Sequence, residues 1–304
     1  MGEDTPFNQK KTAKEWRKRL TLSDFFDPTQ PWDLRDRVGD EKFRNLFNFL
    51  PEHFREGPWK PVATYTLVLV VCLVFYATID ANMKYDNDII KDFVGDQSYP
   101  AFTITWFYNV GLFSWMAFVS WGVYSYYKSF GPWVSFTMCG WTIMWIRHGL
   151  CALAPFLPAV RLWIGILRFP VLLSSTTIFA VWNFVLMPVI ALGILKGEKR
   201  KNFFRFANSW RMWQIHVLNI LYAYLNCVWA EPNPSPLHMG DVDAAVFYIM
   251  TYMLFYYLIM DRLGMQFYPI FSPRTNMCIF SWMMTAGLCF GNYSFWNKVL
   301  SAKK

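Results

Sequence analysis

The chain has 304 residues, of which 55% are hydrophobic, 20% aromatic and only 16% charged. A soluble domain normally carries about 25% charged residues, and here the apolar residues also gather in long blocks. This composition excludes an ordinary soluble domain and predicts an integral membrane protein. The basic residues behind the net charge of +8 cluster in the first sixty positions and in 196–211. That distribution favours contact with anionic lipid headgroups and argues against nucleic acid, because no soluble module carries a basic face.

The first part of the chain is hydrophilic and mixed in charge. Residues 12–20 (TAKEWRKRL) predict a short basic helix with Trp16 towards lipid, and residues 43–50 predict a second interfacial helix. We therefore divide the chain into an amphipathic extension, 1–60, that lies on the membrane surface or docks on a partner, and a transmembrane helical domain, 61–304.

Apolar blocks that are long enough to cross a bilayer follow this extension, since about 20 helical residues span roughly 30 Å. The expected spans are 61–79, 101–127, 162–195, 210–230, 242–260 and 277–296. The block 133–160 is ambiguous, because Arg147 and His148 lie in its middle and Pro155 and Pro158 close it. It is a further span, a re-entrant hairpin or an interfacial helix. The predicted fold class is an all-α polytopic transmembrane helix bundle, with six spans favoured and seven as the alternative.

The block 210–230 carries a polar stripe. At about 100° per residue, His216, Asn219 and Asn226 fall on one side of a helix. Polar residues inside a span are costly unless they face protein or a wet cavity, so they are by default a hypothesis of a functional site. The alternative is that they hydrogen-bond neighbouring helices.

Several short stretches resemble one family of multi-span membrane proteins, the androgen-induced and Rolling-stone-like family. They are the Phe169-Pro170 pair that opens a span, His216 followed by Asn219, the Pro-rich loop after that span, and Gly264-Met265-Gln266-Phe267-Tyr268-Pro269. The sharpest of them is the last, because the family shows a glycine followed shortly by an aromatic residue and Tyr-Pro.

The resemblance implies a function, because the best understood members are intramembrane threonine hydrolases that cleave fatty acid esters of hydroxy fatty acids. The stretch 102–105 (FTIT) resembles the family's sequence around its nucleophile, which places that role on Thr105. His216 would be the base, and Asn109, Asn219 and Asn226 would orient the imidazole or donate to an oxyanion. The resemblance also implies no cofactor and an endoplasmic reticulum or plasma membrane location. The alternative for Thr105 is a hydroxyl bonded to its own helix.

The depth of the two side chains limits this hypothesis. Thr105 and His216 each lie roughly 8 Å inside their spans, so they meet only if both spans start on the same side of the membrane. That condition requires that 133–160 does not cross, and we therefore expect this block to be buried without spanning. The distribution of Lys and Arg fits an inside N-terminus with seven crossings best, which argues the other way.

The remaining candidate features are weaker. The six cysteines show no CxxC spacing and indicate small buried hydrophobes, with neither disulfides nor zinc. His238, Asp241, Asp243 and Glu231 could hold a metal, but a solvated loop explains them better, and no metal is predicted.

A different class of function remains open beside the hydrolase. Fold resemblance does not guarantee chemistry, and abundant Trp, Tyr and Phe suit docking surfaces. The chain would then be a non-catalytic, lipid-binding accessory subunit of a large membrane complex, for example a respiratory complex of the mitochondrial inner membrane. Its partners are membrane lipids and, in this second reading, other membrane subunits.

Overall fold

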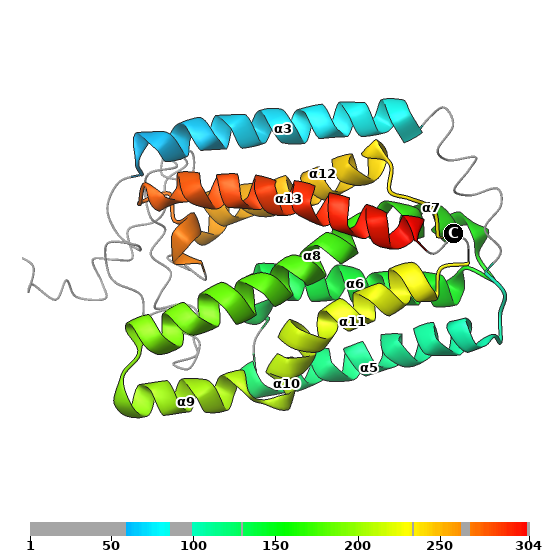
Figure 1. Cartoon of the computed structure of the whole chain (residues 1–304), viewed down its shortest axis with the longest axis horizontal. Helices are drawn as coiled ribbons and strands as arrows, with labels where there is room; N and C mark the ends of the chain where they lie inside the picture. Colours follow the sequence, from blue (N-terminus) through cyan, green and yellow to red (C-terminus); the bar gives the residue numbers. More distant parts are fainter. Residues whose placement is uncertain (1–58, 86–98, 129, 233, 263–267, 303–304) are drawn as a thin grey trace, which may run out of the picture.

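A computed structural model describes residues 59–85, 99–128, 130–232, 234–262 and 268–302, and every regular element in these ranges is helical (Figure 1). The predicted interfacial helices of the extension 1–60 lie outside the described residues. Three helices are long and apolar enough to cross a membrane, namely Pro61–Ile79, Arg168–Gly193 and Met239–Met260. The prediction of an all-α protein with apolar membrane-type helices is confirmed at this level.

The elements have the following bounds. The long helices are α3 (Pro61–Tyr85), α5 (Ile104–Tyr127), α6 (Phe136–Leu153), α8 (Arg168–Val181), α12 (Met239–Phe255) and α13 (Met277–Ser301). The short helices are α7 (Arg161–Ile166), α9 (Gly197–Ala207), α10 (Trp210–Trp213) and α11 (Asn219–Tyr224). Five π turns are η4 (Trp182–Leu186), η5 (Val189–Ile194), η6 (Gln214–Leu218), η7 (Leu225–Trp229) and η8 (Tyr256–Met260). The 3-10 turns are η2 (Gly131–Val134), η3 (Pro158–Val160) and η9 (Pro269–Phe271).

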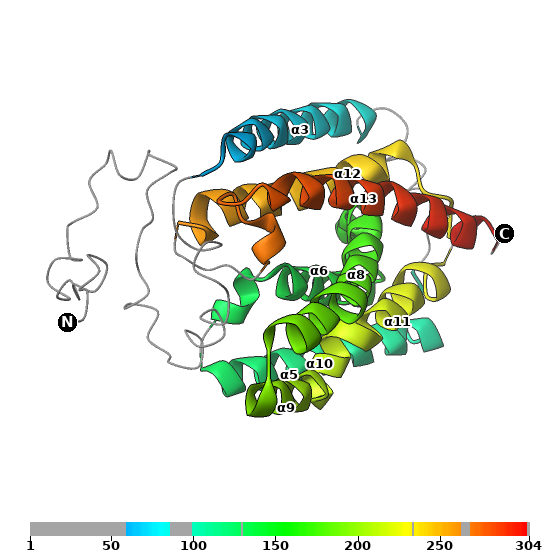
Figure 2. The same cartoon turned by 60° about the vertical axis from the view of Figure 1, so that its left-hand side comes forward.

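The helices are arranged in layers (Figures 1 and 2). Helices α3, α12 and α13 lie along one side, α6, α8 and α11 occupy the middle, and α5 runs along the opposite side with α9 and α10. The core between the layers is made of large side chains with no more than 1% exposure, among them Trp141, Phe169, Leu172 and Tyr256. Their burial fixes how the middle helices sit against both outer layers, because protein interiors pack as densely as organic crystals.

Helix α6 runs antiparallel to α5 over its whole length. Trp106 near the start of α5 donates to the carbonyl of Ala152 at the end of α6 (2.9 Å), and Trp141 near the start of α6 donates to Ser120 (3.1 Å). Eighteen helical residues cover about 27 Å, close to the thickness of a bilayer core. The block 133–160 therefore forms a helix that is buried against α5, and whether it also crosses the membrane stays a prediction. Helix α6 passes through the same depth as α5.

The break between these helices has a clear local cause. Lys128 ends α5 in the left-handed conformation (φ 53°), and the turn η2 contains Pro132. Ser135 then caps α6, because its side chain accepts a hydrogen bond from the amide of Met138 (3.2 Å). These signals reverse the chain within a few residues.

The segment 210–230 is helical, but the helix is interrupted, and it is not among the three described helices that are long and apolar enough to cross a membrane. Helices α10 and α11 alternate with the π turns η6 and η7, which contain His216 and Asn226. A π turn inserts an extra residue into the helical register and often marks a functional site. It also rotates the residues that follow, so the stripe predicted from a uniform helical period is divided between two sites.

Candidate functional site

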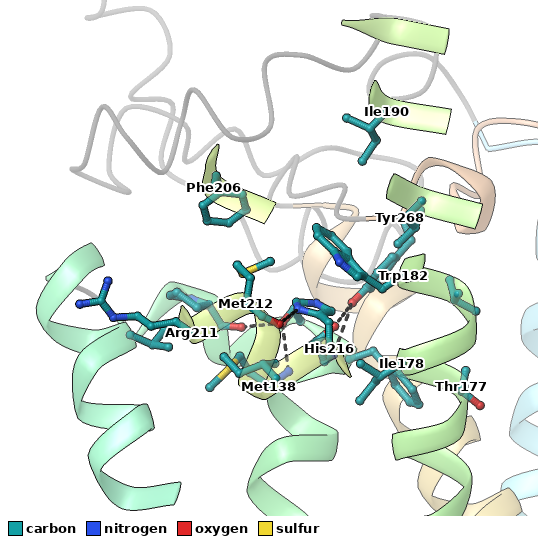
Figure 3. A pocket seen from close by; sticks show the side chains of 18 of the residues that line it. Met138, Thr177, Ile178, Trp182, Ile190, Phe206, Arg211, Met212, His216 and Tyr268 are labelled. Atoms are coloured by element: carbon teal, nitrogen blue, oxygen red, sulfur yellow. Dashed lines mark hydrogen bonds between the residues drawn. The ribbon is translucent and has the colours of Figure 1, made fainter. Parts of the chain in front are cut away.

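A cavity of about 910 Å³ lies at the end of the bundle where α5 ends and α6 and α10 begin (Figure 3). Most of its wall is apolar, with Leu173 and Ile178 from α8 and Ile249 from α12 among the residues that form it. The polar groups on the wall include Thr137, Thr177, Lys199, Asn202, Arg205, Ser209, Arg211, His216 and Tyr268. This size is at the upper end for small-molecule pockets, and the mixture of greasy walls with few polar groups is typical of a ligand site.

His216 is one of the cavity residues. Its ring stacks on Trp182 with centroids 4.1 Å apart and planes 29° apart, and its Nδ1 lies 3.2 Å from the carbonyl oxygen of Met212. A carbonyl only accepts hydrogen bonds, so this contact assigns the ring proton to Nδ1. The other nitrogen, Nε2, then carries a lone pair and can accept a proton. Figure 3 shows His216 beside Trp182, with Tyr268 among the side chains that line the cavity.

Thr105 does not reach this cavity. Its hydroxyl lies 3.1 Å from the hydroxyl of Thr103, and its carbonyl accepts from the amide of Asn109 (3.0 Å). On α5, the residue at the level of His216 is Trp115. The indole of Trp115 donates a hydrogen bond to the side chain of Gln214 (3.0 Å), which belongs to the same π turn as His216.

The separation follows from helix geometry. Trp115 follows Thr105 by ten positions, which corresponds to about 15 Å along α5. The structure therefore does not bring Thr105 and His216 together, because α6 traverses the bundle and α5 and α10 start at opposite ends. The predicted nucleophile and base lie at different depths.

Thr137 is one of several hydroxyl residues that line the cavity together with His216. It stands two residues into α6, and its Oγ1 lies 3.4 Å from the phenol oxygen of Tyr268. Burial raises the pKa of Tyr268 to about 12, so its phenol stays protonated and can donate. Sequence reasoning missed Thr137 because 133–160 was treated as non-crossing. If 133–160 crosses the membrane, its first residues, and not those of 101–127, lie at the depth of His216.

Two of the predicted supporting asparagines do come together, but around a different histidine. Asn226 donates to the side-chain oxygen of Asn109 (2.8 Å), and Nδ1 of His148 lies 2.9 Å from that same oxygen. All three side chains are buried. The stripe residue Asn226 therefore belongs to the half of the bundle near the start of α5.

This second cluster continues into a buried ion pair. Arg147 bonds the side chain of Asn226 and lies 2.6 Å from the carboxylate of Glu231, which also accepts from the hydroxyl of Tyr99 (2.6 Å). The partner of Arg147 is thus an acid that lies far along the chain. A buried pair with additional hydrogen bonds holds its elements in place.

The other predicted site residues have structural positions. Asn219 donates to the carbonyl of Ser175 on α8 (3.2 Å), which ties two helices together. Tyr268 lines the cavity and Pro269 opens η9, whereas Gly264 lies outside the described residues.

The acids of the loop before α12 are buried, contrary to the expectation of a solvated loop. Asp241 accepts from the amide of His238 (2.8 Å) and pairs with Arg168 (3.3 Å). This pair anchors the start of α12 to the start of α8. The cysteines are all unpaired, and four of the six are buried, while Cys72 on α3 is exposed.

Comparison with known proteins gives no match among family models, curated proteins or solved structures. The functional proposal therefore depends on the residues that line the cavity.

Proposed function

We propose that this protein is a membrane-embedded hydrolase of lipid carboxylic esters that works in the cavity, with Thr137 as nucleophile and His216 as base. The observation that supports it is that a threonine hydroxyl, an imidazole and a protonated phenol line one largely apolar cavity. The helices around the cavity are of the membrane type, so an acyl chain can enter it from the bilayer.

Each group has a role that conserves atoms and charge. The Thr137 oxygen attacks the ester carbonyl carbon while Nε2 of His216 takes the hydroxyl proton. The phenol of Tyr268 donates to the oxyanion that forms. His216 then gives its proton to the departing alcohol, and an acyl-threonine remains. A water molecule, deprotonated by His216, releases the fatty acid and restores the hydroxyl.

The surroundings of His216 suit this role. Stacking on Trp182 restricts the ring, and the Met212 carbonyl holds the proton on Nδ1. The same carbonyl stabilises the imidazolium that forms when Nε2 is protonated. It replaces the carboxylate of a serine hydrolase triad with a neutral acceptor.

The test is labelling of the full-length protein in detergent with an alkyl fluorophosphonate, which phosphonylates activated hydroxyls. We expect labelling of the wild type and its loss in Thr137→Val and His216→Ala. Thr177→Val is the matched control, because Thr177 lines the same cavity from α8 and should leave labelling unchanged. Labelling that survives in Thr137→Val and is lost in Thr105→Val would overturn the assignment.

A second candidate is a non-catalytic, lipid-binding accessory subunit of a larger membrane complex. It is favoured by the outer face of α3, where Tyr65, Phe75 and Tyr76 are 77%, 67% and 62% exposed. Large exposed aromatic side chains suit contact with other membrane subunits as well as lipid. Absence of labelling together with co-purification in a fixed ratio with other chains would support this candidate.

A further inference from the structure

Three cations line the cavity of His216, and no carboxylate is among the described residues that line it. They are Lys199 and Arg205 of α9 and Arg211 of α10, which we call the basic rim. We infer that the basic rim binds the phosphate of an anionic glycerophospholipid whose acyl chain occupies the apolar part of the cavity. This inference rests on the proposed function, since it names the class of lipid that the site accepts.

Arg211 provides the main observation. Its guanidinium lies 5.2 Å from the ring centroid of Trp210 and 5.7 Å from that of Tyr126, and its Nε is buried with no hydrogen-bond partner among the described residues. A buried donor without a partner is costly, and more so when its group is charged. Because the Nε packs against Gly122 of α5, an anion in the cavity would meet the outer nitrogens of this guanidinium and neutralise its charge.

Three buried arginines of this chain pair with acids. The pairs are Arg147 with Glu231, Arg168 with Asp241 and Arg274 with Asp261, at 2.6, 3.3 and 2.8 Å. Among the described residues, no acid lies within salt-bridge distance of Arg211. Its charge is therefore open to an anionic ligand in the cavity.

Helix α9 adds the other two cations. Phe203 and Phe206 line the cavity from the same helix as Lys199 and Arg205, so α9 presents both apolar and basic groups to it. Its acid, Glu198, pairs instead with the exposed Lys201 (3.4 Å). Figure 1 places α9 at one end of the bundle, where an amphipathic helix meets lipid headgroups.

Two features favour a phosphate over a carboxylate. Three cations exceed the single charge of a fatty acid, and a phosphate offers several oxygens to a guanidinium fork and an ammonium. Arg211 also precedes His216 by five residues, about 7.5 Å along the helix. In a glycerophospholipid the acyl ester stands a few bonds from the phosphate, so a headgroup on the basic rim leaves the ester within reach of His216.

The experiment measures lipid binding by native mass spectrometry of the purified full-length protein, with phosphatidylglycerol and phosphatidylcholine of identical chains. We expect phosphatidylglycerol to bind on the order of tenfold more tightly or better, as expected for charge-assisted hydrogen bonds. Arg211→Gln should remove this preference, Lys199→Gln should reduce it, and Arg211→Lys should retain part of it. Lys201→Gln is the matched control and should bind like the wild type, because Lys201 has the same charge on the same helix but does not line the cavity.

Equal binding of the two lipids by the wild type would overturn the inference. An equal loss in Lys201→Gln would also do so, because it would mean diffuse surface attraction. Stronger displacement of the lipid by oleate than by phosphatidylglycerol would overturn the assignment of a phosphate. His216→Ala should keep the lipid preference while losing fluorophosphonate labelling, so failure of the hydrolase and failure of the headgroup site are separate results.

Discussion

The guanidinium of Arg147 lies 2.6 Å from the carboxylate of Glu231, and both side chains have no more than 1% exposure. This pair joins α6 to the segment that follows η7, two parts of the chain separated by 84 positions. It explains how a helix with two basic residues at its centre can traverse an apolar bundle. Arg147 is neutralised inside the protein, and His148 beside it is held by Asn109.

The first prediction concerns this pair. Arg147→Ala leaves the Glu231 charge buried and unpaired and should destabilise the protein by about 3–5 kcal/mol. Lys201→Ala breaks an exposed pair with Glu198 and should cost about 1 kcal/mol or less. Thermal unfolding of the purified protein in one detergent measures both. Equal shifts in the two variants would contradict a structural role for the buried pair.

The second prediction tests whether α6 crosses the membrane. Phe130 and Phe156 are exposed and flank α6 at its two ends. In a background without reactive native cysteines, Phe130→Cys and Phe156→Cys should react with a membrane-impermeant maleimide from opposite sides of sealed vesicles. Reaction of both from the same side would mean that the helix does not cross, and Thr137 would then lose its place at the depth of His216.

The third prediction concerns the contact between α6 and α8. A Cβ at Gly140 would lie 2.7 Å from the Cδ1 of Ile178 and 3.0 Å from the Cβ of Ser174. Gly140→Ala should therefore force these helices apart and destabilise the bundle by about 1–3 kcal/mol. Gly111→Ala in α5 is the control, because nothing lies within 4 Å of its added Cβ. If both variants melt like the wild type, the close approach of α6 and α8 is wrong.

The fourth prediction concerns the orientation of His216. Trp182→Ala removes the ring that stacks on the imidazole and should slow fluorophosphonate labelling by on the order of tenfold or more, because misplaced catalytic groups lose rate steeply. Phe184→Ala lies in the same π turn but is 71% exposed and should label normally. An equal rate in both variants would show that the stack does not position the base.

Part of the site was accessible to sequence reasoning. Hydrophobic blocks predicted the membrane-type helices, because length and apolar content decide whether a segment can cross. His216 was selected because an imidazole inside such a block is costly unless it has a use, and it does line the cavity. Tyr268, which belongs to the sequence motif at 264–269, lines the same cavity.

The structure differs from the sequence predictions in two respects, each with its own cause. The prediction that His216 and Asn226 lie on one side of a helix requires a continuous helical period. The π turns η6 and η7 break that period. The choice of Thr105 assumed that the block containing Arg147 does not traverse the bundle. That assumption was reasonable from sequence, because the acid that neutralises Arg147 lies far along the chain.

The sequence by itself determined that the protein is helical, that it has helices long and apolar enough to cross a membrane, and that His216 lies inside an apolar helical segment. Periodicity and length are properties of single segments, so they can be read locally. Only the tertiary structure decided that Thr137, and not Thr105, lines the same cavity as His216. The reason is physical: the level at which two helices meet depends on how they pair in the bundle, and α6 runs antiparallel to α5 with Arg147 neutralised by the distant Glu231.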